Sequence, residues 1–164
     1  MSTAAPTQHA RWEARLNDLG LTLPQAPPPA AIYQPFMRAG AQLWVAGQIA
    51  VREGSLIHSG RVGAEVTLEE ARACAEQCAL NLLAQLKLAT GSLESLSRVV
   101  KLNVFVASEA SFVEQHLVAN AASELFGAVF GDLGAHARSA VGVASLPLNS
   151  PVEIDAVFEV RDLS

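Results

Sequence analysis

The chain has 164 residues, a formal net charge of −5 and only 16% charged residues, with a mean hydropathy of +0.28. Because it is acidic and lacks basic runs, we expect no nucleic-acid partner. No stretch approaches the ~20 apolar residues of a membrane-spanning helix, so we expect no membrane contact either. The length suits one domain, and the surplus of apolar residues predicts that copies of the chain associate.

Residues 1–30 are predicted to be an appendage, an N-terminal helix and a proline-rich arm, on a single domain at 31–164. Residues 1–8 are expected to be disordered and carry no apolar segment typical of a secretory signal. The stretch ARWEARLNDLGLTLP then predicts a short helix that ends near Gly20, and PQAPPPAA predicts an extended arm. Cys74 and Cys78, four apart in a helical segment, favour buried reduced thiols, and we expect a cytoplasmic protein.

The clearest predicted element is a helix that begins after Thr67 and ends at Gly91. Thr67 and Glu70 have the spacing of a capping box, and glycine is typical of the position after a helix. Before this helix, residues 41–60 contain two strand-like runs separated by the turn sequence REGS. This part of the chain therefore predicts two strands followed by a helix.

The second half of the chain predicts a strand, a helix and two further strands. The first strand covers residues 97–108, and a second helix is expected from Ser111 to Phe130, with another capping-box spacing between Ser111 and Glu114. The closing strands are predicted at 138–147 and 152–160. The resulting order, β-β-α-β-α-β-β, is an α+β fold.

Two long helices can cover only one face of such a sheet. The other face is predicted to be apolar and to pack on copies of the chain, with these residues exposed on it: Val141, Val143, Ile154, Ala156 and Phe158. In the strand at 97–108, simple alternation places Val100, Leu102, Val104 and Val106 on one face.

Arg138 is the sharpest candidate for a functional residue. A permanently charged guanidinium at the start of a core-like strand needs an anionic partner. One alternative is a salt bridge to Glu153 or Asp155 on a neighbouring strand. The other is a clamp for a substrate carboxylate, which arginine can bind through two parallel hydrogen bonds.

Glu153 and Asp155 are two residues apart and should point to the same side of their strand, in a row that Glu159 continues. Such a row is often a solvated face, but at a subunit seam a carboxylate could position a water molecule or move a proton. The four histidines have no metal-binding spacing, so no metal site is expected.

The C-terminal block ARSAVGVASLPLNSPVEIDAVFEV resembles the signature of the reactive intermediate deaminase (Rid/YjgF) family, also called endoribonuclease L-PSP-like. LWVAGQIAV, VVKLNVFVAS and VANAASELF resemble further segments of that family, and the N-terminal helix is similar to a longer subgroup. The resemblance implies a chorismate-mutase-like fold and a homotrimer with clefts between subunits. It also implies cofactor-independent hydrolysis of enamines or imines such as 2-aminoacrylate to keto acids and ammonia.

The resemblance also assigns roles to residues of this chain. Arg138 would bind the substrate carboxylate, and Glu153 would hold or activate the attacking water. The remaining positions implied to line the substrate site are Tyr33, Phe36, Ala46, Gly47, Asn120 and Ala140. Relative to the family pattern, Ala46 replaces a serine, Phe36 an aromatic hydroxyl and Ala140 a cysteine.

Two other functions remain open from the sequence. A non-catalytic protein that binds small carboxylates or keto acids would use the same arginine, and the missing hydroxyl at Ala46 favours it. The ribonuclease activity attributed to part of the family is disfavoured by the acidic charge balance.

Overall fold

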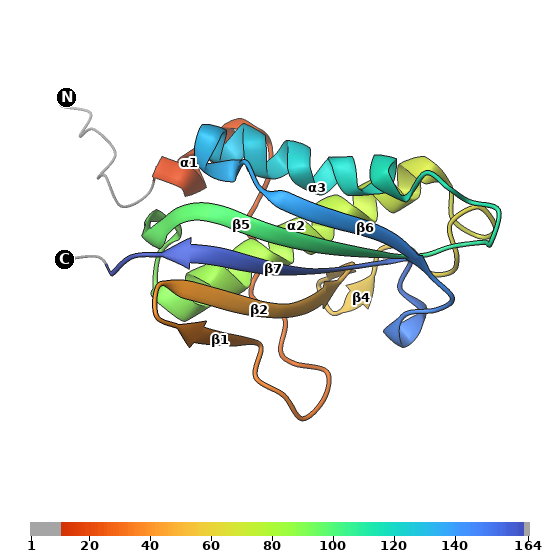
Figure 1. The fold of residues 1–164 in the computed structure, drawn as a ribbon, viewed down its shortest axis with the longest axis horizontal. Helices are drawn as coiled ribbons and strands as arrows, with labels where there is room; N and C mark the ends of the chain where they lie inside the picture. The colour runs from red at the N-terminus through yellow and green to blue at the C-terminus, as the bar shows by residue number, and fades with distance from the viewer. Residues whose placement is uncertain (1–10, 163–164) are drawn as a thin grey trace.

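The computed structural model describes residues 11–162, so the stretch 1–8 lies outside the described residues. The helices and strands follow one another as α1 (Arg11–Asp18), β1 (Phe36–Ala39), β2 (Gln42–Ile49), β3 (Val51–Arg52), β4 (Ser55–Leu56), α2 (Leu68–Thr90), β5 (Leu96–Ala107), α3 (Gln115–Phe130), β6 (Ala137–Val143) and β7 (Val152–Val160). Figure 1 shows a sheet with α2 and α3 on one of its sides, which confirms the predicted α+β class. In the described part of the chain, no helix combines the length and apolar character needed to cross a membrane.

The main sheet has the strand order β1-β2-β7-β5-β6. β7 pairs antiparallel with both β2 and β5, whereas β6 pairs parallel with β5. The parallel pair requires a crossover, which α3 provides. As a result β6 and β7, consecutive in the chain, are separated by β5. The expectation that Arg138 lies on a strand adjacent to Glu153 is therefore wrong.

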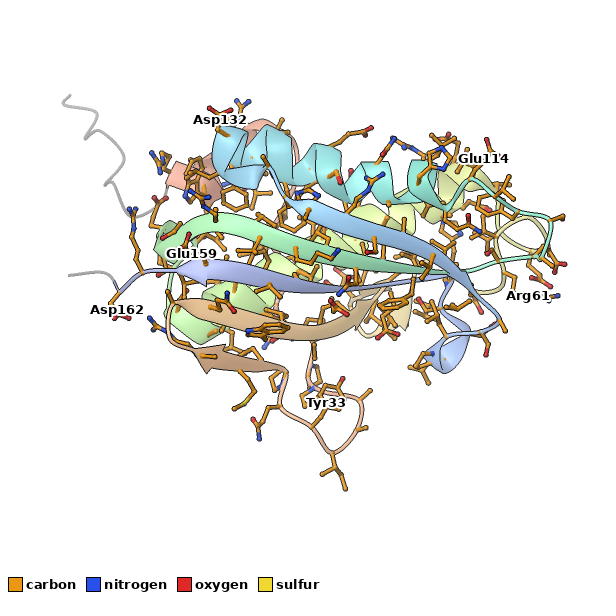
Figure 2. The ribbon with its side chains drawn as sticks, viewed as in Figure 1. Tyr33, Arg61, Glu114, Asp132, Glu159 and Asp162 are labelled. Atoms are coloured by element: carbon orange, nitrogen blue, oxygen red, sulfur yellow. The ribbon has the colours of Figure 1, made fainter. Side chains whose placement is uncertain are left out.

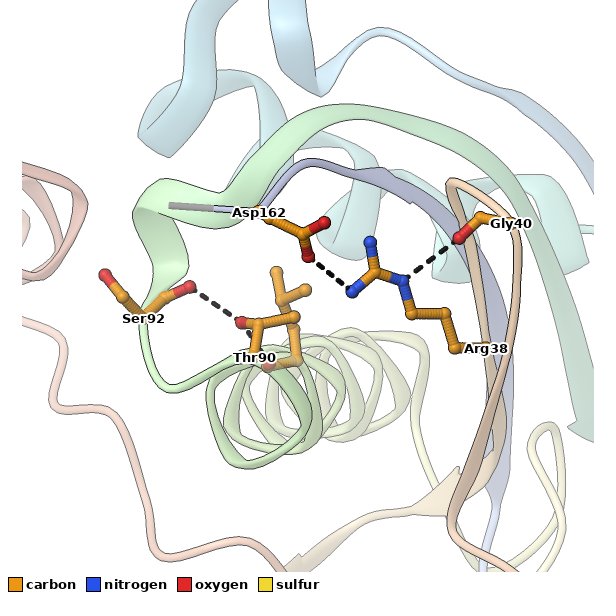
Figure 3. Close-up of polar contacts among 6 residues, drawn as sticks. Arg38, Gly40, Thr90, Ser92 and Asp162 are labelled. Atoms are coloured by element: carbon orange, nitrogen blue, oxygen red, sulfur yellow. Dashed lines mark hydrogen bonds and ion pairs between the residues drawn. The ribbon is translucent and has the colours of Figure 1, made fainter. Parts of the chain in front are cut away.

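The N-terminal strands differ from the prediction in two ways. β1, which the sequence did not indicate, forms by pairing with β2 around Gly40, whose φ of 62° favours glycine. Arg38 fixes this hairpin, because it donates to the Gly40 carbonyl and pairs with Asp162 at 2.8 Å (Figure 3). The predicted second strand shrinks to β4, which forms only a short separate hairpin with β3.

The two long helices confirm one predicted start and correct the other. At α2 the Thr67–Glu70 capping box is present in both directions, and Gly91 ends the helix at a φ of 82°. The last turn of α2 is further held by Thr90, whose single hydroxyl proton can be donated either to the Leu86 carbonyl at 2.8 Å or to the Ser92 carbonyl at 2.9 Å; Figure 3 shows the contact with Ser92. α3 begins at Gln115 rather than at Ser111, and no side chain caps its start.

The faces of the sheet are also assigned differently from the prediction. Ile154, Ala156 and Phe158 lie buried beneath the helices, so they do not belong to the open face. The reason is that β7 is a central strand whose alternate residues face α2. In β5 a bulge at Val100 breaks the alternation, and Val99 rather than Val100 joins the buried face. Val141, 45% exposed, does lie on the open face.

The N-terminal segment packs on the sheet-and-helix body. Trp12 contacts Phe130 edge to face with ring centroids 5.1 Å apart, and its backbone N–H donates to the carboxylate of Glu94. Leu16 is 1% exposed within the core. Further along, the amide of Gln85 in α2 binds the Pro27 carbonyl at 2.7 Å. The domain boundary at residue 30 stays a prediction.

Candidate functional site

Arg138 lies on β6, an edge strand, and points to the helix-covered face of the sheet. Its backbone is paired with Leu102, which is completely buried on that face. The half-buried guanidinium donates from Nη1 to Ser123 Oγ at 2.9 Å and from Nη2 to the His116 carbonyl at 3.0 Å, both on α3. No acidic side chain in residues 11–162 pairs with it. The salt-bridge alternative is therefore contradicted: uncharged groups orient this cation.

Asn120 and Ala140 lie close to Arg138 in the fold. Asn120 comes four residues after His116 and three before Ser123, so it shares the side of α3 that faces Arg138. Ala140 follows two positions along β6 on the same side of the strand, where it packs partly against the core. The structure thus gathers these three predicted site residues into one group.

Glu153 lies on the opposite, open face of the sheet. Its neighbours in the sheet are Ile49 of β2 and Phe105 of β5. The half-buried carboxylate has no hydrogen-bond donor among the described side chains and backbone. Burial, with a smaller contribution from the charge of Asp155, raises the pKa of Glu153. A carboxyl group of this kind suits proton transfer.

Gly47 is in direct contact with that carboxylate. A Cβ atom at Gly47 would collide with Glu153 Oε1 and Cδ, so a larger residue would have to displace the carboxylate from this position. Ala46 and Gly47 form a bulge in β2, where the register with β7 shifts between Val45 and Gln48. Ala46, Gly47 and Glu153 therefore form a second group of predicted site residues.

Two glutamines support this bulge: Gln48, which belongs to the segment that resembles the family but was not assigned to the site, and Gln85, which was not singled out from the sequence. Gln48, 6% exposed, donates its amide to the Ala46 carbonyl at 3.1 Å. Gln85 of α2 reaches both Gln48 at 3.5 Å and the Pro27 carbonyl at 2.7 Å. The sequence signal for Gln85 was its polar side chain on the buried side of α2, which otherwise carries mainly alanine, cysteine and leucine.

Asp155 extends the acidic row on the open face, as the spacing predicted. Its carboxylate accepts a 2.7 Å hydrogen bond from Asn103. Burial still raises the pKa of Asp155, against the opposing effects of Asn103 and Lys101. The row is thus half-buried within the single chain rather than fully solvated.

Tyr33 and Phe36 contact neither the group around Arg138 nor the group around Glu153. Tyr33 lies in the loop that projects beside β1 and β2 (Figure 2), and its side chain is exposed. Phe36 is paired with Val45 and packs against the core on the helix-covered face. Their roles in binding stay predictions. In the described part, no three His, Cys, Asp or Glu side chains gather closely enough to hold a metal ion.

The predicted site is thus divided into two halves on opposite faces of one sheet. Arg138 pairs with Leu102 and Glu153 with Phe105, three residues apart on β5, so their side chains leave the strand in opposite directions. Two cavities of about 850 and 860 Å³ lie instead beside α1 and beneath the proline-rich arm, lined by neither residue. A single chain does not join the guanidinium to the carboxylate.

Known proteins resemble the chain over nearly its whole length. A family model described as "YjgF/chorismate_mutase-like, putative endoribonuclease" matches residues 13–160. Protein TCP17 of Trypanosoma cruzi is 46% identical over 153 residues, 93% of this chain and 96% of that protein. The 2-iminobutanoate/2-iminopropanoate deaminase of Dermatophagoides farinae is 30% identical over 143 residues, 86% and 95% of the two chains. The crystal structure of Atu1372 from Agrobacterium tumefaciens, of unknown function, superposes with a TM-score of 0.86 at 48% identity, covering 93% of both chains.

Proposed function

Because the chain belongs to the YjgF/chorismate mutase-like family, also called Rid/YjgF, we propose that it hydrolyses carboxylate-bearing enamines or imines to keto acids and ammonia. The family includes proteins named as imine deaminases, one of them 30% identical to this chain. A substrate like 2-aminoacrylate carries one carboxylate and one reactive carbon–nitrogen unit. A site for such a substrate needs a cation that binds the carboxylate and a proton-transfer group that acts at the carbon–nitrogen unit.

The observation that carries this proposal is the state of Arg138. Its two hydrogen bonds to Ser123 and the His116 carbonyl use two of five N–H donors and neutralise no charge. One N–H remains at Nε and one at each terminal nitrogen, enough for a bidentate carboxylate contact. A half-buried, pre-oriented guanidinium without an acidic partner suits a substrate carboxylate.

We propose further that the working unit is a homotrimer in which one copy supplies Arg138 and the next supplies Glu153. The separation of the two groups on opposite faces of the sheet supports a site shared between copies. Trp44 and Val141, 53% and 45% exposed on the open face, give that face the apolar character of an interface. Light scattering should give the mass of three chains; a monomer at micromolar concentration would contradict this assembly.

The chemistry assigned to Glu153 is proton transfer. An enamine first takes a proton from solvent on its β-carbon and becomes the protonated imine, with a C=NH2+ group. The Glu153 carboxylate then removes a proton from water as the new C–O bond forms at the imine carbon. The nitrogen of the resulting carbinolamine is protonated by Glu153, the C–N bond breaks, and loss of the hydroxyl proton leaves the keto acid and ammonia. Burial raises the pKa of Glu153, which favours its return of the removed proton to the nitrogen.

The test is the hydrolysis of imines generated in place by an amino-acid oxidase, with keto-acid release followed over time. The wild-type chain should accelerate release, and Glu153→Gln should lower the rate about 10²-fold or more while keto-acid binding persists. Arg138→Ala should abolish carboxylate binding with the assembly intact. Binding without any acceleration would instead identify a non-catalytic keto-acid binder, and dissociation of Arg138→Ala would identify a structural arginine.

For the location we propose the cytoplasm, supported by the two free, buried thiols of Cys74 and Cys78. Burial raises the pKa of Cys74 to about 12, which leaves that thiol protonated and inert. Cell fractionation should recover the protein with cytosolic markers; recovery in the culture medium would contradict this location.

A further inference from the structure

Two residues outside the predicted site form a hydrogen-bond chain behind Arg138. His136, directly before β6, places Nδ1 2.6 Å from the Gly134 carbonyl and Nε2 2.9 Å from Ser123 Oγ. A carbonyl only accepts, so Nδ1 carries the proton, and neutral His136 accepts the Ser123 hydroxyl proton at Nε2. The same Ser123 oxygen accepts the N–H of Arg138. Each of the three hydrogen bonds that link Arg138, Ser123, His136 and Gly134 thus has one donor and one acceptor.

We propose that Ser123 and His136 are positioning residues for Arg138, and that they make its grip on a substrate carboxylate depend on pH. This inference rests on the proposed function in one respect only, that Arg138 binds the carboxylate. It adds that the site binds an anionic ligand more tightly when His136 is protonated.

The geometry explains how one proton changes the grip. When Nε2 of His136 gains a proton it becomes a donor, and Ser123 Oγ accepts from both Arg138 and His136. The hydrogen bonds are conserved in number, but a second positive charge now lies one hydroxyl away from the guanidinium. An anion bound at Arg138 is attracted by both charges, and by linkage its binding must favour protonated His136.

The surroundings leave Arg138 as the charged group that faces His136. Phe126 of α3 packs edge to face on the imidazole at a centroid distance of 6.0 Å. Glu124, beside Ser123, is paired with Arg72 at 2.9 Å, and Lys101 of β5 binds Ser139 on the other face. Asp132, two residues before Gly134, is exposed.

The unliganded histidine is neutral at pH 7, so the switch operates on the acidic side. Burial lowers the pKa of His136, the charge of Arg138 lowers it further, and the hydrogen bond to Gly134 opposes both. A bound carboxylate offsets the Arg138 contribution and raises this pKa again. Affinity should therefore rise as pH falls below neutrality.

The experiment measures binding of pyruvate, a small keto acid, by calorimetry between pH 5 and 8. For the wild-type chain the dissociation constant should fall roughly fivefold towards pH 5. His136→Gln keeps an acceptor for Ser123 but cannot gain the proton. Its pyruvate dissociation constant should therefore equal that of the wild type at pH 8 and should not show the roughly fivefold decrease towards pH 5. Ser123→Ala should bind several-fold more weakly at every pH, and Ser123→Thr should restore binding.

Two matched controls isolate the pair. His58→Ala removes a histidine that pairs instead with Glu70 near the start of α2, and Ser139→Ala removes the hydroxyl next to Arg138 in β6, which binds Lys101 on the other face. Both should keep the wild-type pH profile. Glu153 is present in all variants, so its own titration cancels in the comparison.

The outcomes separate the two proposals. Pyruvate binding with the same pH profile in wild type and His136→Gln overturns the inference and leaves the carboxylate clamp intact. Absence of pyruvate binding in the wild type overturns the clamp, and the proposed function with it. In the bound state, the pKa of His136 followed by NMR should increase; a decrease or no change would also overturn the inference.

Discussion

At Gly47 the backbone of β2 and the carboxylate of Glu153 are in contact, and a side chain would fill the same space. We expect Gly47→Ala to displace the flexible end of the Glu153 side chain, to change the free energy of unfolding by no more than about 1 kcal/mol, and to lower imine hydrolysis. Urea unfolding and the coupled oxidase assay measure the two effects.

A matched glycine provides the control. At Gly127, in the interior of α3, a Cβ atom would meet nothing within 4 Å. Gly127→Ala should therefore raise the free energy of unfolding by about 0.5–1 kcal/mol and leave hydrolysis unchanged. A Gly47→Ala protein as active as the wild type would show that the carboxylate does not occupy this position.

The titration of Glu153 predicts a pH-dependent stability. Since burial raises its pKa above the ordinary 4.5, the folded state binds a proton more readily than the unfolded state. Its contribution to stability is therefore fully present below the unfolded pKa and is lost as pH rises through the folded one. Glu153→Gln should be more stable than the wild type at pH 8, with the difference shrinking towards pH 4 in urea titrations; a constant difference would contradict the raised pKa.

At the scale of elements, the two capping-box spacings in the sequence show that a helix start can be set by its own sequence or by the surrounding fold. The box at Thr67 forms, while α3 starts at Gln115 without a side-chain cap. We expect Thr67→Ala to cost about 1 kcal/mol of unfolding free energy. Ser111 also lies three residues before a glutamate, as Thr67 does, but it caps no helix, so Ser111→Ala should cost nearly nothing. Equal losses in thermal or urea unfolding would mean that α3 also uses its predicted cap.

At the scale of the whole molecule, the division of the site between two faces predicts complementation. Arg138→Ala and Glu153→Gln should each be inactive alone. If one copy supplies the arginine and the next the glutamate, subunits mixed in equal amounts and reassembled should regain roughly a quarter of the wild-type sites. The coupled assay on the mixture, with each variant alone as control, measures this gain. No recovery after confirmed exchange of subunits would place both groups in one chain's own site.

Patterns between residues close in sequence predicted much of this protein correctly. Thr67 and Gly91 set the ends of α2, and the spacing of Glu153 and Asp155 placed them on one face, because capping and strand alternation depend on neighbours within a few residues. Arg138 was also identifiable, because a guanidinium in an apolar strand is costly without a partner.

Only the tertiary structure decided which strands are neighbours and which face each residue occupies. The position of β7 between β2 and β5 buried Phe158, and β5 between β6 and β7 separated Arg138 from Glu153, since strand order depends on long-range pairing that local sequence does not encode. The bulge at Gly47 and the Ser123–His136 support behind Arg138 likewise arise from contacts between distant segments. The sequence by itself determined most of the helices and strands and the charged candidates; packing between distant segments determined that Arg138 and Glu153 lie in separate groups on opposite faces of the sheet.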